Sequence, residues 1–361
     1  MDPFKKNVAI SIDGGGIRGI IATKALWMLE DYLKKTGYIK NTLNEKVHLF
    51  AGTSTGAIIA AALAAGIPAR DLTRFYRNLG RDVFKKFFPG SAFLRMVVTG
   101  EHYSNKKLES LLNTILSKKI GHGTNMNYFF SLNPPIDVVF TTFDITSNRT
   151  RYIKPWNAPE MKPDTDENFT PDENFTEWPV VKAVLASSAA PTYFPFIEGE
   201  HGLYMDGGVG SYNNPCFLAA YEIYVYLQCI WGWKPEKTTL ISLGTGDEPP
   251  IFTKKSKNKK LLFKMFDLVF GAFMQSAAKQ QVFLVNSFFE ALDFRRFQVN
   301  LKKKVDLDDA SEIDDLEKYG EEMGEKILGN KPEEIGRIYE GFEVSFKCPI
   351  VTSRKRIPKR K

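Results

Sequence analysis

Hydrophobic and polar residues follow a regular pattern over the first part of the chain. Residues 8–12 favour a β-strand and run into a glycine cluster, and residues 17–35 carry apolar side chains at helical spacing. A second short apolar stretch, 47–51, leads through a Gly-Ser turn into an alanine-rich helical stretch. The order strand, helix, strand, helix predicts an α/β fold, with a mostly parallel central sheet flanked by helices.

Further elements are expected along the rest of the chain. The pattern predicts strands at 136–143, 151–153, 203–205 and 239–243, and helices at 103–118, 180–188, 215–230 and 259–297. No clear interdomain linker separates these elements. We therefore expect one core, residues 8–247, and a helical C-terminal extension, residues 248–361, packed on it.

Charge and apolar residues together raise the question of a membrane. The formal net charge is +7, and residues 354–361 alone contain six basic side chains. Such a tail is attracted to an anionic surface, a membrane leaflet or a nucleic acid, or it is simply solvated. Residues 83–98 mix aromatic side chains, Phe87 and Phe88 among them, with Lys and Arg. This segment either covers the core or forms a flap that faces lipid.

No segment of the sequence predicts a membrane span or a secretory signal. The N-terminus lacks an apolar signal region, and the uncharged stretch 47–69 is interrupted by GTSTG and Pro68. Three cysteines without a CxxC spacing argue against a disulfide framework or a zinc site and favour a reducing compartment. We expect a soluble, cytoplasmic protein that contacts a membrane peripherally, with no nucleic acid polymer as partner.

The strongest chemical motif is GTSTG, residues 52–56, which fits the G-x-S-x-G pattern of a nucleophile elbow. It stands between a predicted strand and a predicted helix. The glycines allow a sharp turn that projects the Ser54 side chain, and the N-terminus of the helix favours developing negative charge. A structural turn is the alternative, but this setting favours Ser54 as a nucleophile.

A nucleophilic serine needs a base, and the four histidines are poorly placed for this role. The last 160 residues contain none, and His48 lies on the strand before the turn. Asp206 follows the predicted strand 203–205. Because parallel strands present functional side chains at their carboxyl ends, we expect Asp206 at the same sheet edge as Ser54. A turn or N-cap role for Asp206 is the alternative.

The glycine cluster DGGGIRG, residues 13–19, exposes backbone N–H groups between a strand and a helix, and Arg18 adds a cation. Such a loop binds an anion, either a phosphate or a tetrahedral oxyanion. Residues 14–19 also fit the dinucleotide fingerprint G-x-G-x-x-G, but the next strand lacks the acidic residue that would hold the ribose. A dinucleotide-binding oxidoreductase and a non-catalytic membrane-binding protein therefore stay open as alternatives.

Together these motifs resemble the patatin-like phospholipases. In the family's order they are DGGGIRG (13–19), GTSTG (52–56), ASSAAPTYF (186–194), DGGVGSYNNP (206–215) and ISLGTG (241–246). The resemblance covers about residues 8–247. It implies a lipid acyl hydrolase with Ser54 as nucleophile and Asp206 as base, and with the oxyanion surrounded by Gly14, Gly15, Gly16 and Arg18.

The resemblance also implies a substrate and a setting. The substrate would be a membrane phospholipid, hydrolysed through an acyl-enzyme without metal or cofactor. The size and the helical C-terminal part are similar to those of bacterial members switched on by cyclic nucleotides in phage defence. This likeness implies a cyclic-nucleotide activator and a role in antiviral defence, and it leaves a homo-oligomer open.

Overall fold

A computed structural model describes residues 4–82, 103–157, 173–249 and 262–335. The basic tail, 354–361, and the segment 83–98, for which the sequence suggested membrane contact, lie outside these residues. Within the described ranges, no helix is both long and apolar enough to cross a bilayer.

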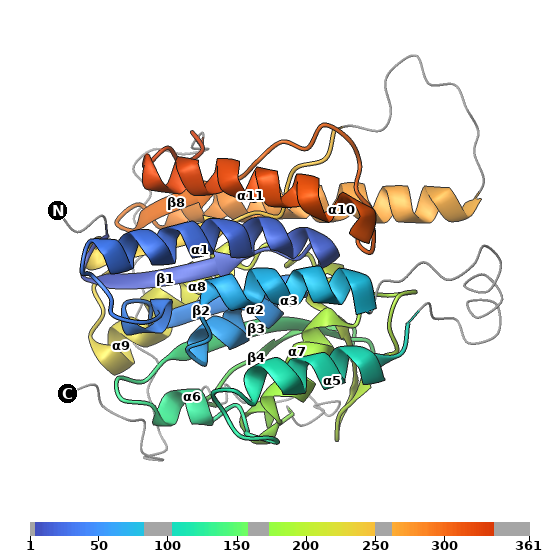
Figure 1. The fold of residues 1–361 in the computed structure, drawn as a ribbon. Coiled ribbons are helices and arrows are strands. Elements are labelled where there is room, and N and C mark those ends of the chain that lie inside the picture. Colours follow the sequence, from blue (N-terminus) through green and yellow to red (C-terminus); the bar gives the residue numbers. More distant parts are fainter. Residues whose placement is uncertain (1–3, 83–102, 158–172, 250–261, 336–361) are drawn as a thin grey trace.

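Eight strands form one central sheet (Figure 1). In chain order they are β1 (Asn7–Ile12), β2 (Leu49–Gly52), β3 (Asp137–Asp144), β4 (Arg149–Ile153), β5 (Ile197–Glu198), β6 (Leu203–Asp206), β7 (Thr238–Leu243) and β8 (Asp293–Phe297). Their order across the sheet is β5-β6-β3-β2-β1-β7-β8, and β4 pairs with β3 outside this path. The strands from β3 to β8 in this order are parallel, whereas β4 and β6 run antiparallel to β3, and β5 antiparallel to β6. The predicted mostly parallel sheet is confirmed.

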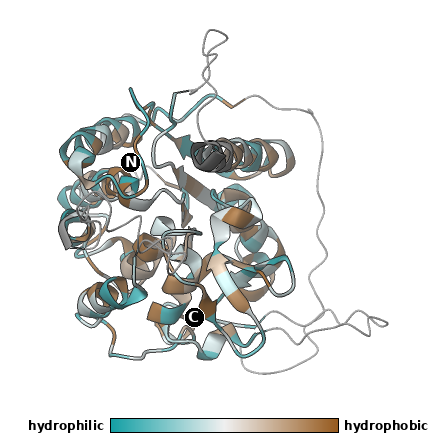
Figure 2. Cartoon of the chain, turned by 90° about the vertical axis from the view of Figure 1, so that its right-hand side faces the viewer, coloured by the Kyte–Doolittle hydropathy of each residue, from teal (hydrophilic) through white to brown (hydrophobic). Residues whose placement is uncertain are grey.

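Helices flank the sheet on both sides, as the view turned by 90° shows (Figure 2). They are α1 (Gly19–Lys35), α2 (Thr55–Ala64), α3 (Ala69–Asp82), α5 (Asn105–Leu116), α6 (Tyr128–Ser131), α7 (Val180–Ser188), α8 (Cys216–Tyr221), α9 (Gln228–Trp231), α10 (Leu262–Phe288) and α11 (Ile313–Leu328). A π-helical turn, Glu222–Leu227, joins α8 to α9.

Both faces of the central strands are buried, which is why these strands are apolar throughout. In β1, Val8, Ile10 and Ile12 pack with the layer that contains α1, α2, α3, α5, α7 and α11. Ala9 points to the opposite face and packs with α8 and the end of α10. The core therefore lies in two layers, one on each side of the sheet, and the sheet edge between them carries the turns that follow β1 and β2.

The C-terminal part differs from the sequence-based expectation. The predicted helix 259–297 ends at Phe288, where α10 ends, and Asp293–Phe297 forms β8, which pairs in parallel with β7. The extension 248–361 is therefore not a purely helical addition, because it supplies an edge strand of the central sheet. The residues of β8 continue the helical pattern of polar and apolar residues that begins in α10. The pairing that makes β8 a strand involves partners 54 positions earlier, such as Thr239 and Asp293, and so leaves no local signal.

The cysteines also differ from expectation. Cys216 is a buried free thiol, whereas Cys229 is disulfide-bonded. The sequence argued against a disulfide framework, and it gave no sign that Cys229 is bonded. Spacing along the chain does not determine which cysteines meet in space.

Candidate active site

Ser54 lies on the sharp turn between β2 and α2. Its backbone has φ 57° and ψ −123°, a conformation that is rare for a residue with a side chain and costs about 1–3 kcal/mol. The turn is tightly packed: a Cβ atom at Gly52 would overlap the carbonyl oxygen of Gly56, and one at Gly56 would overlap that of Ile12. The two glycines of the motif therefore permit the strained turn, which places Ser54 at the N-terminus of α2.

Asp206 approaches this turn from the opposite direction to the one expected. It ends β6, which runs antiparallel to β3, and it lies opposite Thr142. The end of β2, Gly52, lies opposite Phe140 of the same strand. The expectation that Asp206 ends a parallel strand is therefore wrong. The residue still lies at the predicted edge, because β3 is longer than β2 and β6 pairs only with the last residues of β3.

Ser54 and Asp206 line the same cavity. The Asp206 side chain is buried, and this burial raises the pKa of its carboxyl group to about 6. Hydrogen bonds from the Ser54 side chain and from the Gly208 N–H (2.8 Å) act in the opposite direction. A carboxyl group with a pKa near neutrality is better matched to proton transfer at neutral pH than an ordinary aspartate.

The histidines lie elsewhere. His48 precedes β2 and is therefore at the opposite end of this strand from Ser54, while His122 and His201 are exposed. His102 lies outside the described residues. Among the described residues that line the Ser54 cavity, none is a histidine.

The end of α7 connects Ser54 to Asp206. The buried Ser187 hydroxyl accepts the Ser54 backbone N–H (3.0 Å), and the Ser188 hydroxyl donates to the Ser54 carbonyl (3.1 Å). The next residue, Ala189, accepts the backbone N–H of Asp206 (3.0 Å). Three consecutive residues thus fix the backbone of both candidate catalytic residues relative to each other.

The glycine loop offers fewer free donors than the sequence suggested. The Gly14 N–H donates to the Asn213 carbonyl (2.8 Å), so the prediction that it surrounds an oxyanion is not compatible with this arrangement. The N–H groups of Gly15 and Gly16 have no acceptor within the described residues, and both residues line the Ser54 cavity. The same holds, over the same part of the chain, for the N–H of Thr55 at the start of α2.

Arg18 does not line this cavity. Its Nη1 forms an ion pair with Glu248 (2.6 Å), and its Nε donates to the Gly15 carbonyl (3.4 Å). The side chain lines a second, neighbouring cavity instead. The Glu248 carboxylate holds the guanidinium there. Arg18 therefore contacts the glycine loop through the Gly15 carbonyl and does not line the Ser54 cavity.

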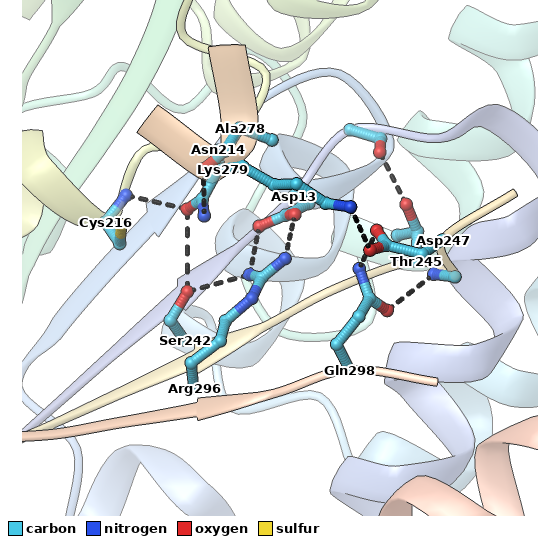
Figure 3. Close-up of polar contacts among 12 residues, drawn as sticks. Asp13, Asn214, Cys216, Ser242, Thr245, Asp247, Ala278, Lys279, Arg296 and Gln298 are labelled. Carbon is cyan, nitrogen blue, oxygen red and sulfur yellow. Dashed lines mark hydrogen bonds and ion pairs between the residues drawn. The ribbon is translucent and has the colours of Figure 1, made fainter. Parts of the chain in front are cut away.

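The C-terminal third of the chain supplies polar contacts that hold the glycine loop in place (Figure 3). Arg296 of β8 binds the two carboxylate oxygens of Asp13 at 2.8 and 2.6 Å, and both side chains are 4% exposed. The Thr245 hydroxyl donates to the Gly14 carbonyl (2.6 Å). A side chain at Gly15 would overlap Thr245, so this glycine is required for packing whatever its N–H group binds.

The turn that carries Thr245 is supported in its own right. Gln298 accepts the Gly246 N–H (2.9 Å) and donates to Asp247 (3.1 Å). Lys279 of α10 forms an ion pair with the same carboxylate (3.1 Å), and Figure 3 shows these side chains converging on the turn. The loop next to Ser54 thus depends on a chain of polar contacts that begins on β8 and α10.

The rest of the cavity wall is apolar. Helices α2, α3, α5 and α10 contribute to the lining of this cavity. The apolar and aromatic wall residues are Ile58, Leu79, Leu108, Ala190, Pro191, Tyr193, Phe194, Met274 and Leu307. Such a cavity, with a serine and a buried carboxyl group on its wall, suits an apolar chain that ends in a polar reactive group.

Comparison with known proteins identifies the family. The family model described as patatin-like phospholipase matches residues 10–220, more than half of the chain. The chain belongs to the patatin-like phospholipase family. Its members are serine-dependent lipid hydrolases, so the chain is a carboxylic ester hydrolase. Both alternatives from the sequence, an oxidoreductase and a non-catalytic membrane-binding protein, are set aside.

Several curated relatives share this family assignment. The chain is 28% identical to patatin-like protein 2 of Arabidopsis thaliana, over 95% of this chain and 88% of that protein. It is 27% identical to calcium-independent phospholipase A2-gamma of Rattus norvegicus, over 91% of this chain but 40% of the relative. It is 26% identical to the cGAMP-activated phospholipase of Vibrio cholerae, over 60% of this chain and 57% of the relative.

The residues that match the family model include the site residues that the sequence motifs indicated, but not all residues that shape the site. Ser54, Asp206 and the glycine loop lie within residues 10–220, and the sequence singled them out. Arg296 lies outside that range, and its signal was hidden because its partner Asp13 is 283 positions away. Thr55 could have been found, since the residue after a nucleophile commonly supplies an oxyanion donor.

Proposed function

We propose that this chain hydrolyses the acyl ester of a phospholipid or lysophospholipid with Ser54 as nucleophile and Asp206 as base. One observation carries the proposal. Ser54 and the buried Asp206, whose carboxyl group has a pKa of about 6 and interacts with the Ser54 hydroxyl, line one apolar cavity. An acyl chain in that cavity would bring its ester carbonyl to Ser54.

The reaction then proceeds in two steps. The Ser54 oxygen attacks the ester carbonyl while its proton passes to the Asp206 carboxylate, and the tetrahedral intermediate collapses to an acyl-enzyme as Asp206 returns the proton to the leaving alcohol. A water molecule, deprotonated by Asp206, next attacks the acyl-enzyme, and the fatty acid is released as Asp206 returns this proton to the Ser54 oxygen. The N–H groups of Gly15, Gly16 and Thr55, which have no acceptor in the described part of the chain, are the donors we assign to the oxyanion. No step requires a metal or a cofactor.

We further propose that the chain acts from the cytoplasm at the surface of a membrane. The substrate class supports this, because phospholipids lie in bilayers, and the basic residues 354–361 would be attracted to an anionic leaflet. Regulation by a cyclic nucleotide, with a role in antiviral defence, rests on the likeness to the cGAMP-activated phospholipase of Vibrio cholerae. Fatty acid release measured with and without cGAMP tests it, and an equal rate in both would remove this part of the proposal.

The test of the catalytic pair is a three-variant comparison. Ser54→Ala, Asp206→Ala and the double variant should each lower kcat by roughly 10⁴-fold or more, and the double variant should be no worse than either single, because the two groups act as one unit. Ser110→Ala, an exposed serine on α5, is the matched control and should retain full activity. Near-normal turnover by Asp206→Ala would reject Asp206 as the base and direct the search to the histidines.

A further inference from the structure

A second cavity adjoins the one that contains Ser54. Five residues form a common wall, because they line both cavities: Ala190, Pro191, Tyr193, Met274 and Leu307. A molecule with two dissimilar ends could therefore occupy both cavities across this wall.

The two cavities differ in polarity. The Ser54 cavity is lined by the apolar side chains of Ile58, Leu79 and Leu108, which do not line the second cavity. The lining of the second cavity also includes apolar residues such as Ala278 and Val305, but it adds charged and amide side chains, namely Asp13, Arg18, Asn213, Asp247, Glu248, Gln275, Gln298, Lys304 and Asp306. A phospholipid has the same division, with apolar acyl chains on one side of the glycerol esters and a charged headgroup on the other.

Most charges of the second cavity are already engaged within the fold. Arg18 is paired with Glu248 (2.6 Å), and Asp13 with Arg296. Asp247 is held by Lys279 and Gln298. These side chains shape the cavity, and binding to a ligand would require them to leave their partners.

Lys304 and Asp306 are different. They contact each other at 3.4 Å, and their side chains are 37% and 63% exposed. An ion pair of this exposure contributes about 0–1 kcal/mol, so a ligand can replace either partner at little cost. The two residues offer one cation and one anion side by side at the edge of the cavity.

Asn213 links this cavity to the nucleophile. Its side chain is 8% exposed, and its Oδ1 has no hydrogen-bond partner within the described residues. A Cβ atom at Gly14 would overlap this oxygen and lie 3.3 Å from the Ser54 Cβ, so Asn213 is a close neighbour of Ser54. A buried acceptor without a donor indicates a group that the protein itself does not supply.

We propose that the second cavity is the headgroup subsite and that it selects zwitterionic phospholipids. The headgroup phosphate binds Lys304, the ammonium group binds Asp306, and the acyl ester extends past the common wall to Ser54. This inference rests on the proposed function. It adds a substrate class: a phosphate joined to a cationic amine, preferred over an anionic headgroup.

Soluble, monomeric substrates separate this subsite from binding to a lipid surface. We would measure kcat/KM for dihexanoylphosphatidylcholine and dihexanoylphosphatidylglycerol, both below their critical micelle concentrations, and for p-nitrophenyl hexanoate, which has no headgroup. The parent protein should prefer the choline lipid to the glycerol lipid by about two- to fivefold, the effect of one solvent-exposed charge contact.

Two variants assign the contacts. Asp306→Asn should bring the choline-to-glycerol ratio close to one, because it removes the partner of the ammonium group. Lys304→Gln should raise KM for both phospholipids by about two- to fivefold more than it raises KM for p-nitrophenyl hexanoate. Lys302→Gln, an exposed lysine of the same segment outside this cavity, is the matched control and should leave all three values unchanged.

The possible outcomes are distinguishable. An unchanged headgroup ratio in Asp306→Asn, or equal KM changes for all three substrates in Lys304→Gln, would overturn the subsite while hydrolysis by the parent protein still supports Ser54 chemistry. Hydrolysis that survives Ser54→Ala would instead contradict the proposed function itself.

Discussion

Two regions meet at the candidate active site, and they contribute different things. Residues 10–220, which match the family, supply Ser54, Asp206 and the glycine loop. The segment after 247 supplies Arg296, which binds Asp13, and the wall residues Met274 and Leu307. The first region thus contains the groups that we expect to react, and the second contains groups that hold and enclose them.

The difference shows how far local sequence carries information about a site. The candidate reacting groups lie in short sequence motifs, because a tight turn or a glycine-rich loop is formed by residues that are adjacent in the chain. Supporting groups need only meet in space. Arg296 and Asp13 are 283 positions apart, and no spacing rule connects them. A site can therefore be located from its motifs while the contacts that shape it stay hidden.

The largest expected effect outside the catalytic pair is at Arg296. Arg296→Met leaves the Asp13 carboxylate buried without its cation, and we expect the free energy of unfolding to fall by about 3–5 kcal/mol. Asp13→Asn together with Arg296→Met should recover much of this loss, because no buried charge is left. Urea denaturation measures both.

A control for this prediction lies next in the chain. Arg295→Met alters the half-buried pair with Asp293 and should cost about 1 kcal/mol or less. Equal losses at Arg295 and Arg296 would contradict the view that the C-terminal region supports the glycine loop through the Asp13 contact.

The next largest effect is expected for the contacts that hold the turn at Ser54, all of which lie within residues 10–220. Ser187→Ala removes the acceptor of the Ser54 N–H and lets the strained turn relax, so kcat should fall by about 10- to 100-fold. Ser188→Ala is the matched control. The Ser54 carbonyl also accepts the N–H groups of Ala57 (2.9 Å) and Ile58 (3.3 Å), so losing the Ser188 bond should cost less. A larger loss for Ser188→Ala would reject this assignment of roles.

A smaller and continuous effect is the pH dependence. Only the deprotonated Asp206 can accept the Ser54 proton, and burial raises its pKa to about 6. On a soluble ester, kcat/KM should therefore be level above that pH and fall about tenfold per unit below it. Circular dichroism across the same range controls for unfolding. Activity that declines only near the pKa of an ordinary aspartate would contradict the raised pKa of Asp206.

Much of the fold could be predicted from the local sequence pattern, and the elements that could not be predicted depend on contacts between distant residues. The strands at β1, β2, β3 and β7 and the elbow at Ser54 were predictable, because buried parallel strands and tight turns have local signatures. The direction of β6 was not, since it follows from pairing with β3, which lies about 60 positions earlier and leaves no local signal. The strand β8 was hidden by the helical periodicity before it, and Arg18 was assigned to the oxyanion because its partner Glu248 could not be foreseen.

The most direct test of the central claim is to map the adduct of a fluorophosphonate on the intact protein by mass spectrometry. The reagent reacts with a serine oxygen that is activated and faces an oxyanion site. The account predicts one adduct, on Ser54, whose formation is slowed strongly in Asp206→Asn. An adduct on any other serine, with Ser54 unmodified, would contradict it.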